Sequence, residues 1–115
     1  MKTYQFSITS VCQSKGYFDY TFEKTKFIVN GNNIDEALYK LCETIEKESC
    51  YEITKTALKK KEPIYRDTES GCVQVGYIIK AHSEARNDQQ NRWVKIVSDL
   101  WINILEVNNP FAQAL

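Results

Sequence analysis

The chain lacks the short motifs that mark most catalytic and metal-binding sites. Its four glycines are scattered, so it has neither a phosphate-binding loop nor a G-x-G-x-x-G fingerprint. It has one histidine, and no two of its four cysteines are separated by two residues, which excludes zinc ribbons, zinc knuckles and C-x-x-C redox motifs. We therefore expect a protein without metal, without cofactor and without enzymatic activity.

An excess of one charge is also missing. Lys and Arg number 15, Asp and Glu number 15, and the two signs nearly balance in each half of the chain. A protein that neutralises many phosphates carries a basic excess or a basic face, and an inhibitor that mimics DNA would be strongly acidic. Net charge therefore does not make nucleic acid the default partner.

Long apolar runs are absent as well. No run approaches the roughly 18 residues that a membrane-spanning helix needs, and the N-terminal MKTYQFSIT has neither the apolar core nor the cleavage site of a signal peptide. We expect a cytoplasmic protein without a membrane partner, in which Cys12, Cys42, Cys50 and Cys72 are reduced thiols.

The composition is typical of one globular domain. Apolar residues make up 43% of the chain and charged residues 26%, which excludes a disordered protein. A length of 115 residues allows a hydrophobic core without metal or disulfide support. We predict a single α+β domain over residues 1–110 and a loosely ordered tail over residues 111–115.

The first half of the chain predicts a strand hairpin and a helix. Residues 2–12 alternate between apolar and polar side chains. A turn at residues 13–16 leads to a second strand at residues 17–29, in which a β-bulge between Glu23 and Lys26 restores the facing of the apolar residues.

A helix is predicted from Asn33 to Glu48. Asn33 is a candidate N-cap, and Glu36 three residues later completes a pattern like a capping box. An apolar stripe along one face is formed by Ile34, Leu38, Leu41, Cys42 and Ile45.

The sequence after this helix gives weaker indications of secondary structure. Residues 51–57 suggest a third strand, whereas Pro63 and the cluster Asp67–Gly71 indicate a loop. Apolar and polar side chains alternate over residues 72–82, which predicts a strand. Gly76 within this strand indicates a bulge or a close approach of another backbone.

Residues 93–107 fit two structures. On a helical wheel their apolar and polar side chains separate well, and Asn87 could then be the N-cap. Six of these fifteen residues are Val or Ile and two are Trp, which favours a strand after a hairpin loop at residues 86–92. The predicted fold is thus an antiparallel sheet of four or five strands packed by one central helix, ending in either a second helix (ββα-ββα) or a strand (ββα-βββ).

Two groups of residues are candidates for binding. The only local concentration of basic side chains, with an aromatic ring that could stack on a base, is formed by Lys59, Lys60, Lys61, Tyr65 and Arg66. It supports a nucleic-acid-associated module as the alternative function, although such charges also protect edge strands. Trp93 and Trp101 would be core residues of a helix, but on a strand they would line a face suited to an interface.

His82 gives little indication of catalysis. Cys72 would lie ten residues away along the same strand, too far to contact it. Cys12, Cys42 or Cys50 could approach His82 only through the fold, so we interpret it as a surface histidine.

The opening MKTYQFSIT…YFDYTFEKTKFIVNGNNIDEALYKL resembles small phage and prophage accessory proteins, which begin with a hairpin leading to a capped NxxEAL-type helix. The resemblance covers about the first 48 residues. It implies a protein of the host cytoplasm that binds and blocks a host protein or ribonucleoprotein complex, as an anti-CRISPR inhibitor of host defence does. The leading prediction is therefore non-enzymatic protein–protein binding, with self-association as a homodimer through free sheet edges.

Overall fold

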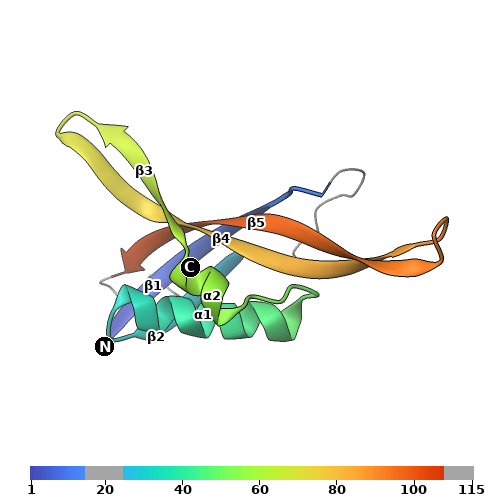
Figure 1. Ribbon diagram of the computed structural model, residues 1–115. Helices are drawn as coiled ribbons and strands as arrows, with labels where there is room; N and C mark the ends of the chain where they lie inside the picture. Colours follow the sequence, from blue (N-terminus) through green and yellow to red (C-terminus); the bar gives the residue numbers. More distant parts are fainter. Residues whose placement is uncertain (15–24, 108–115) are drawn as a thin grey trace.

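The protein is an α+β domain, described here by a computed structural model for residues 1–14 and 25–107 (Figure 1). The elements in chain order are β1 (Lys2–Cys12), β2 (Lys26–Gly31), α1 (Ile34–Glu48), α2 (Lys55–Lys59), β3 (Glu62–Thr68), β4 (Gly71–Asn87) and β5 (Arg92–Val107). The predicted α+β class is confirmed, in its ββα-βββ form. Part of the expected turn at residues 13–16, residues 17–24 of the strand expected at 17–29 with the Glu23 side of its bulge, and the tail at 111–115 fall outside the described residues.

The five strands form one antiparallel sheet in the order β2-β1-β5-β4-β3. Both helices lie on one side of this sheet (Figure 1). We call the opposite side the open face. Because side chains alternate along a strand, the open face carries the odd-numbered residues of β5 and, between Gly76 and Arg86, the even-numbered residues of β4.

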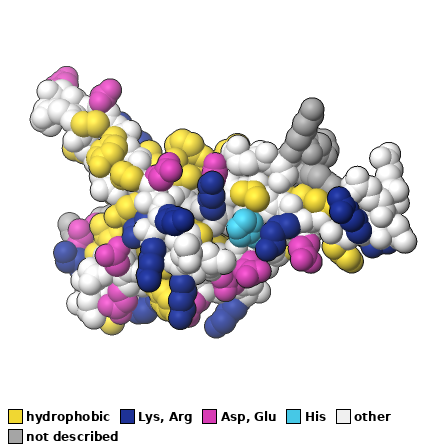
Figure 2. All heavy atoms as spheres, in the orientation of Figure 1, with side chains coloured by type: hydrophobic (Ala, Val, Ile, Leu, Met, Phe, Trp, Pro, Cys, Tyr) yellow, Lys and Arg dark blue, Asp and Glu magenta, His cyan; other side chains and the backbone are white. Residues whose placement is uncertain are grey.

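The hydrophobic core lies between the sheet and α1. Its largest fully buried apolar side chains come from four of the elements, and they are Phe6, Leu38, Leu41, Ile45, Ile79, Leu100 and Ile102. Outside this core the charges are mixed. Lys and Arg side chains are interspersed with Asp and Glu side chains over the face seen in Figure 2, in agreement with the net charge of zero.

The helical interpretation of residues 93–107 is wrong, because this segment belongs to β5, which pairs with β1 on one side and β4 on the other. A central strand carries apolar residues on both faces. Leu100 and Ile102 are buried under the helices, while Trp101 and Leu105 point to the open face. Apolar side chains on two faces produced the spacing that suggested one helical stripe.

The connector before β5 contains a hydrogen bond of the kind found at helix starts. The backbone N–H of Gln90 donates to Oδ1 of Asn87 at 3.1 Å, which is the hydrogen bond expected of a helix N-cap. Here it stabilises a hairpin turn that ends at Asn91, whose φ of 51° is in the left-handed region. Asn adopts that region more readily than most residues.

The predictions for residues 51–66 were also wrong, whereas the loop expected at Asp67–Gly71 is present as the turn between β3 and β4. Instead of a strand at 51–57, Glu52 makes one isolated bridge to His82 and α2 follows. Instead of a loop from Pro63, the chain forms β3 at the edge of the sheet. An edge strand tolerates Pro63 because one side of it needs no hydrogen-bond donor.

The strand predicted at residues 72–82 is confirmed and extends over all of β4. Its pairing with β3 shifts register, since Ile64 lies opposite Gly76 but Tyr65 lies opposite Gln74. Val75 is therefore an extra residue on β4, which is the bulge that Gly76 indicated.

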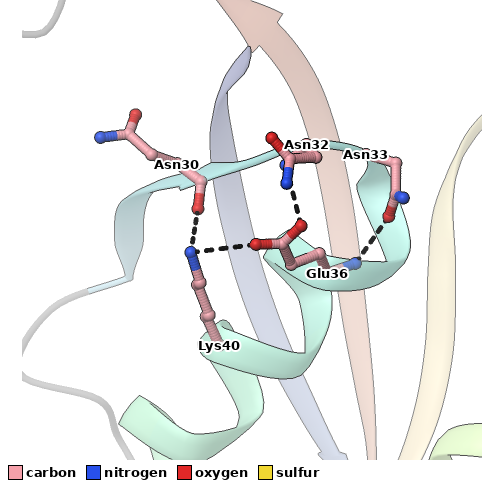
Figure 3. Close-up of polar contacts among 5 residues, drawn as sticks. All are labelled: Asn30, Asn32, Asn33, Glu36 and Lys40. Atoms are coloured by element: carbon pink, nitrogen blue, oxygen red, sulfur yellow. Dashed lines mark hydrogen bonds and ion pairs between the residues drawn. The ribbon is translucent and has the colours of Figure 1, made fainter. Parts of the chain in front are cut away.

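The predicted helix start is confirmed in detail (Figure 3). Oδ1 of Asn33 accepts a hydrogen bond from the N–H of Glu36 at 2.9 Å, and the Glu36 carboxylate in turn accepts from the N–H of Asn32 at 3.1 Å. Lys40 Nζ lies 3.4 Å from Glu36 and donates to the carbonyl oxygen of Asn30 at 3.0 Å. These contacts hold the first turn of α1 against the end of β2.

The apolar stripe of α1 differs from the prediction at one position. Leu38, Leu41, Cys42 and Ile45 are buried as expected, but Ile34 is exposed. Ala37 is buried instead, because the first turn packs against Gly31, where an added Cβ would lie 2.9 Å from the backbone nitrogen of Ala37.

Candidate functional site

Exposed apolar side chains gather on the open face. Leu105 is 61% exposed and Ile28 is 41% exposed, and both lie directly opposite Gln5 of the strand between them. We call the row formed by Ile28, Gln5 and Leu105 the Leu105 patch. Short polar side chains of β1, such as Ser7 and Thr9, continue the surface beyond it.

A groove lies where α2 meets the edge of the open face. It has a volume of about 640 Å³, and Ala57, Lys60, Ile78, Lys80, Asp99 and Trp101 are among the residues that line it. The indole of Trp101 is 41% exposed. We call this hollow the α2 groove, and its volume is in the range of small-ligand pockets.

Beyond this groove the chain forms a two-stranded arm (Figure 1). The pairing of β1 with β5 ends at Cys12 and Ser98, and the bridge from Glu52 reaches β4 only at His82. Residues 83–96 therefore form the arm, which among the described residues has no third strand beside it.

Trp93 lies on this arm and is 64% exposed. It shares the open face of β5 with Trp101, but eight residues of extended chain separate the two indoles by about 27 Å. The structure therefore brings both predicted Trp residues to one face without joining them in one patch.

The predicted basic segment is divided among three environments. The Lys61 side chain is only 21% exposed, with Nζ 3.7 Å from Oδ1 of Asp35 and 5.1 Å from the ring centre of Tyr77. Lys59 ends α2 and Lys60 lines the α2 groove.

The remaining two residues of the segment, Tyr65 and Arg66, are exposed on β3. As neighbours along a strand they point to opposite faces. The structure does not gather the five side chains into one phosphate-binding patch.

The fold brings Cys50 and His82 to the same hollow, which has a volume of about 350 Å³. A histidine that activates a thiol is normally oriented by a third group. Nδ1 of His82 is buried and has no hydrogen-bond partner among the described residues, so that orienting contact is missing. Within the same residues no three His, Cys, Asp or Glu side chains are placed to hold a metal ion.

The cysteines differ in accessibility. All four are free thiols; Cys50 and Cys72 are exposed, whereas Cys42 is buried on the inner side of α1. Burial raises the pKa of the Cys42 thiol to about 12, and the nearby charge of Glu46 adds to the rise.

Sequence reasoning missed the Leu105 patch. Ile28 lies in the predicted second strand of the hairpin, where only the apolar residues of the inner face were considered, and Leu105 was part of the segment with two interpretations. The alternation of residues 93–107, taken as a strand, was the signal that could have identified Leu105 as exposed.

Comparisons with protein families, with curated proteins and with solved structures find no match for this chain. None of the helices in the described ranges 1–14 and 25–107 is long and apolar enough to cross a membrane.

Proposed function

We propose that this protein is not an enzyme and acts by binding another protein through the open face of its sheet. The observation that supports this proposal is the Leu105 patch, where two large aliphatic side chains remain exposed on a sheet face that no second layer of the described chain covers. Exposed apolar groups on an otherwise folded surface are typical of interaction sites.

The surroundings of the patch fit a protein partner. Ser7 and Asn103 lie opposite each other in the next row, and Thr9 lies opposite Trp101. Lys26, which is exposed, lies opposite Ser7 at the outer end of the same row. An apolar centre without charged residues, with polar groups and one lysine at its margin, has the composition of a protein–protein interface, in which charged residues are depleted at the core.

The class of partner follows from the resemblance to phage accessory proteins. The proposed partner is a host protein or ribonucleoprotein complex in the host cytoplasm. Binding would block that complex, as an anti-CRISPR blocks its target. The nucleic-acid alternative has weaker support, because Lys61 already contacts Asp35 and Tyr77 and the other basic residues are dispersed.

A capture experiment tests this proposal. Tagged protein is incubated with bacterial host lysate, and captured proteins are identified by mass spectrometry for the wild type and for the variants Leu105→Asp and Ile28→Asp. We expect both variants to lose a partner that the wild type retains, since each places a charge in the centre of the contact.

The matched control is Tyr39→Asp, which changes an exposed aromatic residue on the outer side of α1. This variant should retain the partner. Undiminished capture by the Leu105→Asp and Ile28→Asp proteins would refute the Leu105 patch as the binding surface.

A further inference from the structure

The open face of β4 and β5, from the α2 groove to the arm, carries a pattern of opposite charges that is symmetric about one row of the sheet. His82 of β4 and Val97 of β5 lie directly opposite each other in this row. On β4, Lys80 and Glu84 lie two residues to either side of His82. On β5, Lys95 and Asp99 lie two residues to either side of Val97.

The two tryptophans extend the same symmetry. Trp93 and Trp101 each lie four residues from Val97, one near the tip of the arm and the other in the wall of the α2 groove. All six side chains point to the open face, since residues of one parity share a face of a strand.

A two-fold axis that lies in the plane of this face and crosses the strands at the His82–Val97 row gives a self-complementary contact. It places Lys95 of one copy against Asp99 of the other, and Lys80 against Glu84. It also places Trp93 of each copy beside Trp101 of the other. We propose that two copies of this chain associate face to face in this arrangement, with the arm of each copy lying against the α2 groove of the other.

The charges of the pattern are free to make these contacts. Lys80 and Asp99 lie opposite each other across β4 and β5, as do Glu84 and Lys95, but none of the four forms an ion pair in the part of the chain that the structure describes. The two faces of the dimer are identical, and each carries both positive and negative side chains. They attract each other only if each lysine of one copy meets an acid of the other, and this axis produces that pairing.

The α2 groove supplies a receptor for the exposed Trp93. Its volume of about 640 Å³ can accept an indole, and Ile78, Ala57 and the Trp101 ring provide apolar contacts. A buried Trp removes about 150–250 Å² from water, more than almost any other side chain. Each copy thus offers one indole and one groove, as an isologous contact requires.

Association would also cover a segment that is weak alone. A two-stranded hairpin is at best marginally stable in water, and residues 83–96 have no third strand among the described residues. In the proposed dimer the arms run antiparallel, so the Leu105 patches lie at opposite ends and remain free. The dimer therefore leaves the Leu105 patch itself available for the proposed function.

Variants with one charge reversed test the arrangement. Light scattering coupled to gel filtration measures their oligomeric state. We expect the wild type to be a dimer. Lys95→Glu places an acid against Asp99 of the other copy, and Asp99→Lys places a lysine against Lys95, so each variant alone should be monomeric. Circular dichroism should show both variants folded.

An equimolar mixture of the two variants should form dimers again, because both contacts are then between opposite charges. Repair by mixing cannot arise from a contact within one chain. If the axis ran parallel to the strands, Lys80 would face Asp99 and the mixture would stay monomeric. A monomeric mixture of folded variants, or a wild type that is monomeric at high micromolar concentration, overturns the proposal.

Removal of the indole gives a second test. Trp93→Ala should weaken dimerisation by at least tenfold, whereas Leu105→Ala, which removes an equally exposed side chain outside the contact, should leave it unchanged. A Trp93→Ala protein that dimerises as well as the wild type also overturns the proposal. Since Leu105 serves only the host partner, failure of the dimer and failure of the proposed function are distinguished.

Discussion

The backbone of Gly76 lies so close to Ile102 that a Cβ at position 76 would be 1.9 Å from the Ile102 carbonyl oxygen. Both residues lie in the middle of the sheet, where β4 carries its bulge against β3. No side chain can be accommodated there without moving β4 away from β5.

Substitution of Gly76 by Ala should therefore destabilise the protein by about 3 kcal/mol or more, because neither backbone can yield cheaply. Urea denaturation measures the change. Ser70→Ala in the turn between β3 and β4 is the control and should be close to neutral. A Gly76→Ala protein as stable as the control would contradict the close approach.

Loss of the Asn33 cap should weaken α1. Asn33→Ala removes the acceptor for the N–H of Glu36 and should cost about 1 kcal/mol of unfolding free energy. Thermal melting followed by circular dichroism reports it. Asn33→Asp keeps an acceptor oxygen at the same place and should retain the stability, so an equal loss in both variants would argue against capping.

The stability contribution of Glu36 should depend on pH. Its hydrogen bond from the Asn32 N–H, together with Lys40, holds the pKa of the Glu36 carboxyl below its usual value of 4.5. A carboxyl whose pKa is lowered on folding stabilises the protein above its unfolded-state pKa, and that contribution disappears as the pH falls through the folded-state pKa.

Glu36→Gln should therefore be less stable than the wild type at pH 7, and the difference should shrink below pH 4.5. Urea denaturation at a series of pH values measures it. Glu69→Gln, in the exposed turn after β3, is the matched control. A Glu36 difference that grew as the solution became more acidic would contradict the assigned hydrogen bond.

Three of the four thiols should fall into two groups by their reactivity. At pH 8 an alkylating reagent should modify Cys50 and Cys72, which are exposed, and leave Cys42 unmodified, because its pKa of about 12 leaves almost no thiolate and its sulfur is buried. Peptide mass spectrometry identifies the modified sites. Denaturant should make Cys42 reactive at the same pH, and rapid labelling of Cys42 in the folded protein would show that α1 packs differently.

Adjacent lysines should differ in their effect on stability. Lys61→Met removes the contacts with Asp35 and Tyr77 and should cost about 0.5–1 kcal/mol. Lys60→Met, one residue earlier, removes a lysine without an ion pair among the described residues and should be nearly neutral. Equal effects of the two substitutions in thermal melting would indicate that Lys61 is as free as its neighbour.

Local signals predicted the parts of the fold that local contacts determine. The start of α1 depends on Asn33 and Glu36, which are three residues apart, and its buried stripe needs only the helical period. The α+β class followed because the strands at residues 2–12 and 72–82 alternate strongly enough to be recognised without knowing their partners.

Distant contacts determined the parts that were missed. β3 contains Pro63 and several charged residues, and it is a strand because β4 is available to pair with it. Residues 93–107 are apolar on both sides since β1 and β4 flank them, and no window of sequence contains that information.

The candidate sites divide in the same way. Trp93 and Trp101 could be selected from the sequence, because Trp is enriched at interfaces. The opposition of Lys80 to Asp99 depends on the register of β4 and β5, which only the complete sheet defines.

The position of β5 between β1 and β4 has a consequence for the nascent chain. β5 is the last of the five strands to be synthesised, and it is the only one that joins the pair β1–β2 to the pair β3–β4. At roughly 5–20 residues per second, the ribosome needs about 4–15 s to proceed from the end of β2 to the end of β5. During that interval α1 has only half of its sheet to pack against, and the closing of the sheet must wait for the final strand to insert into the gap.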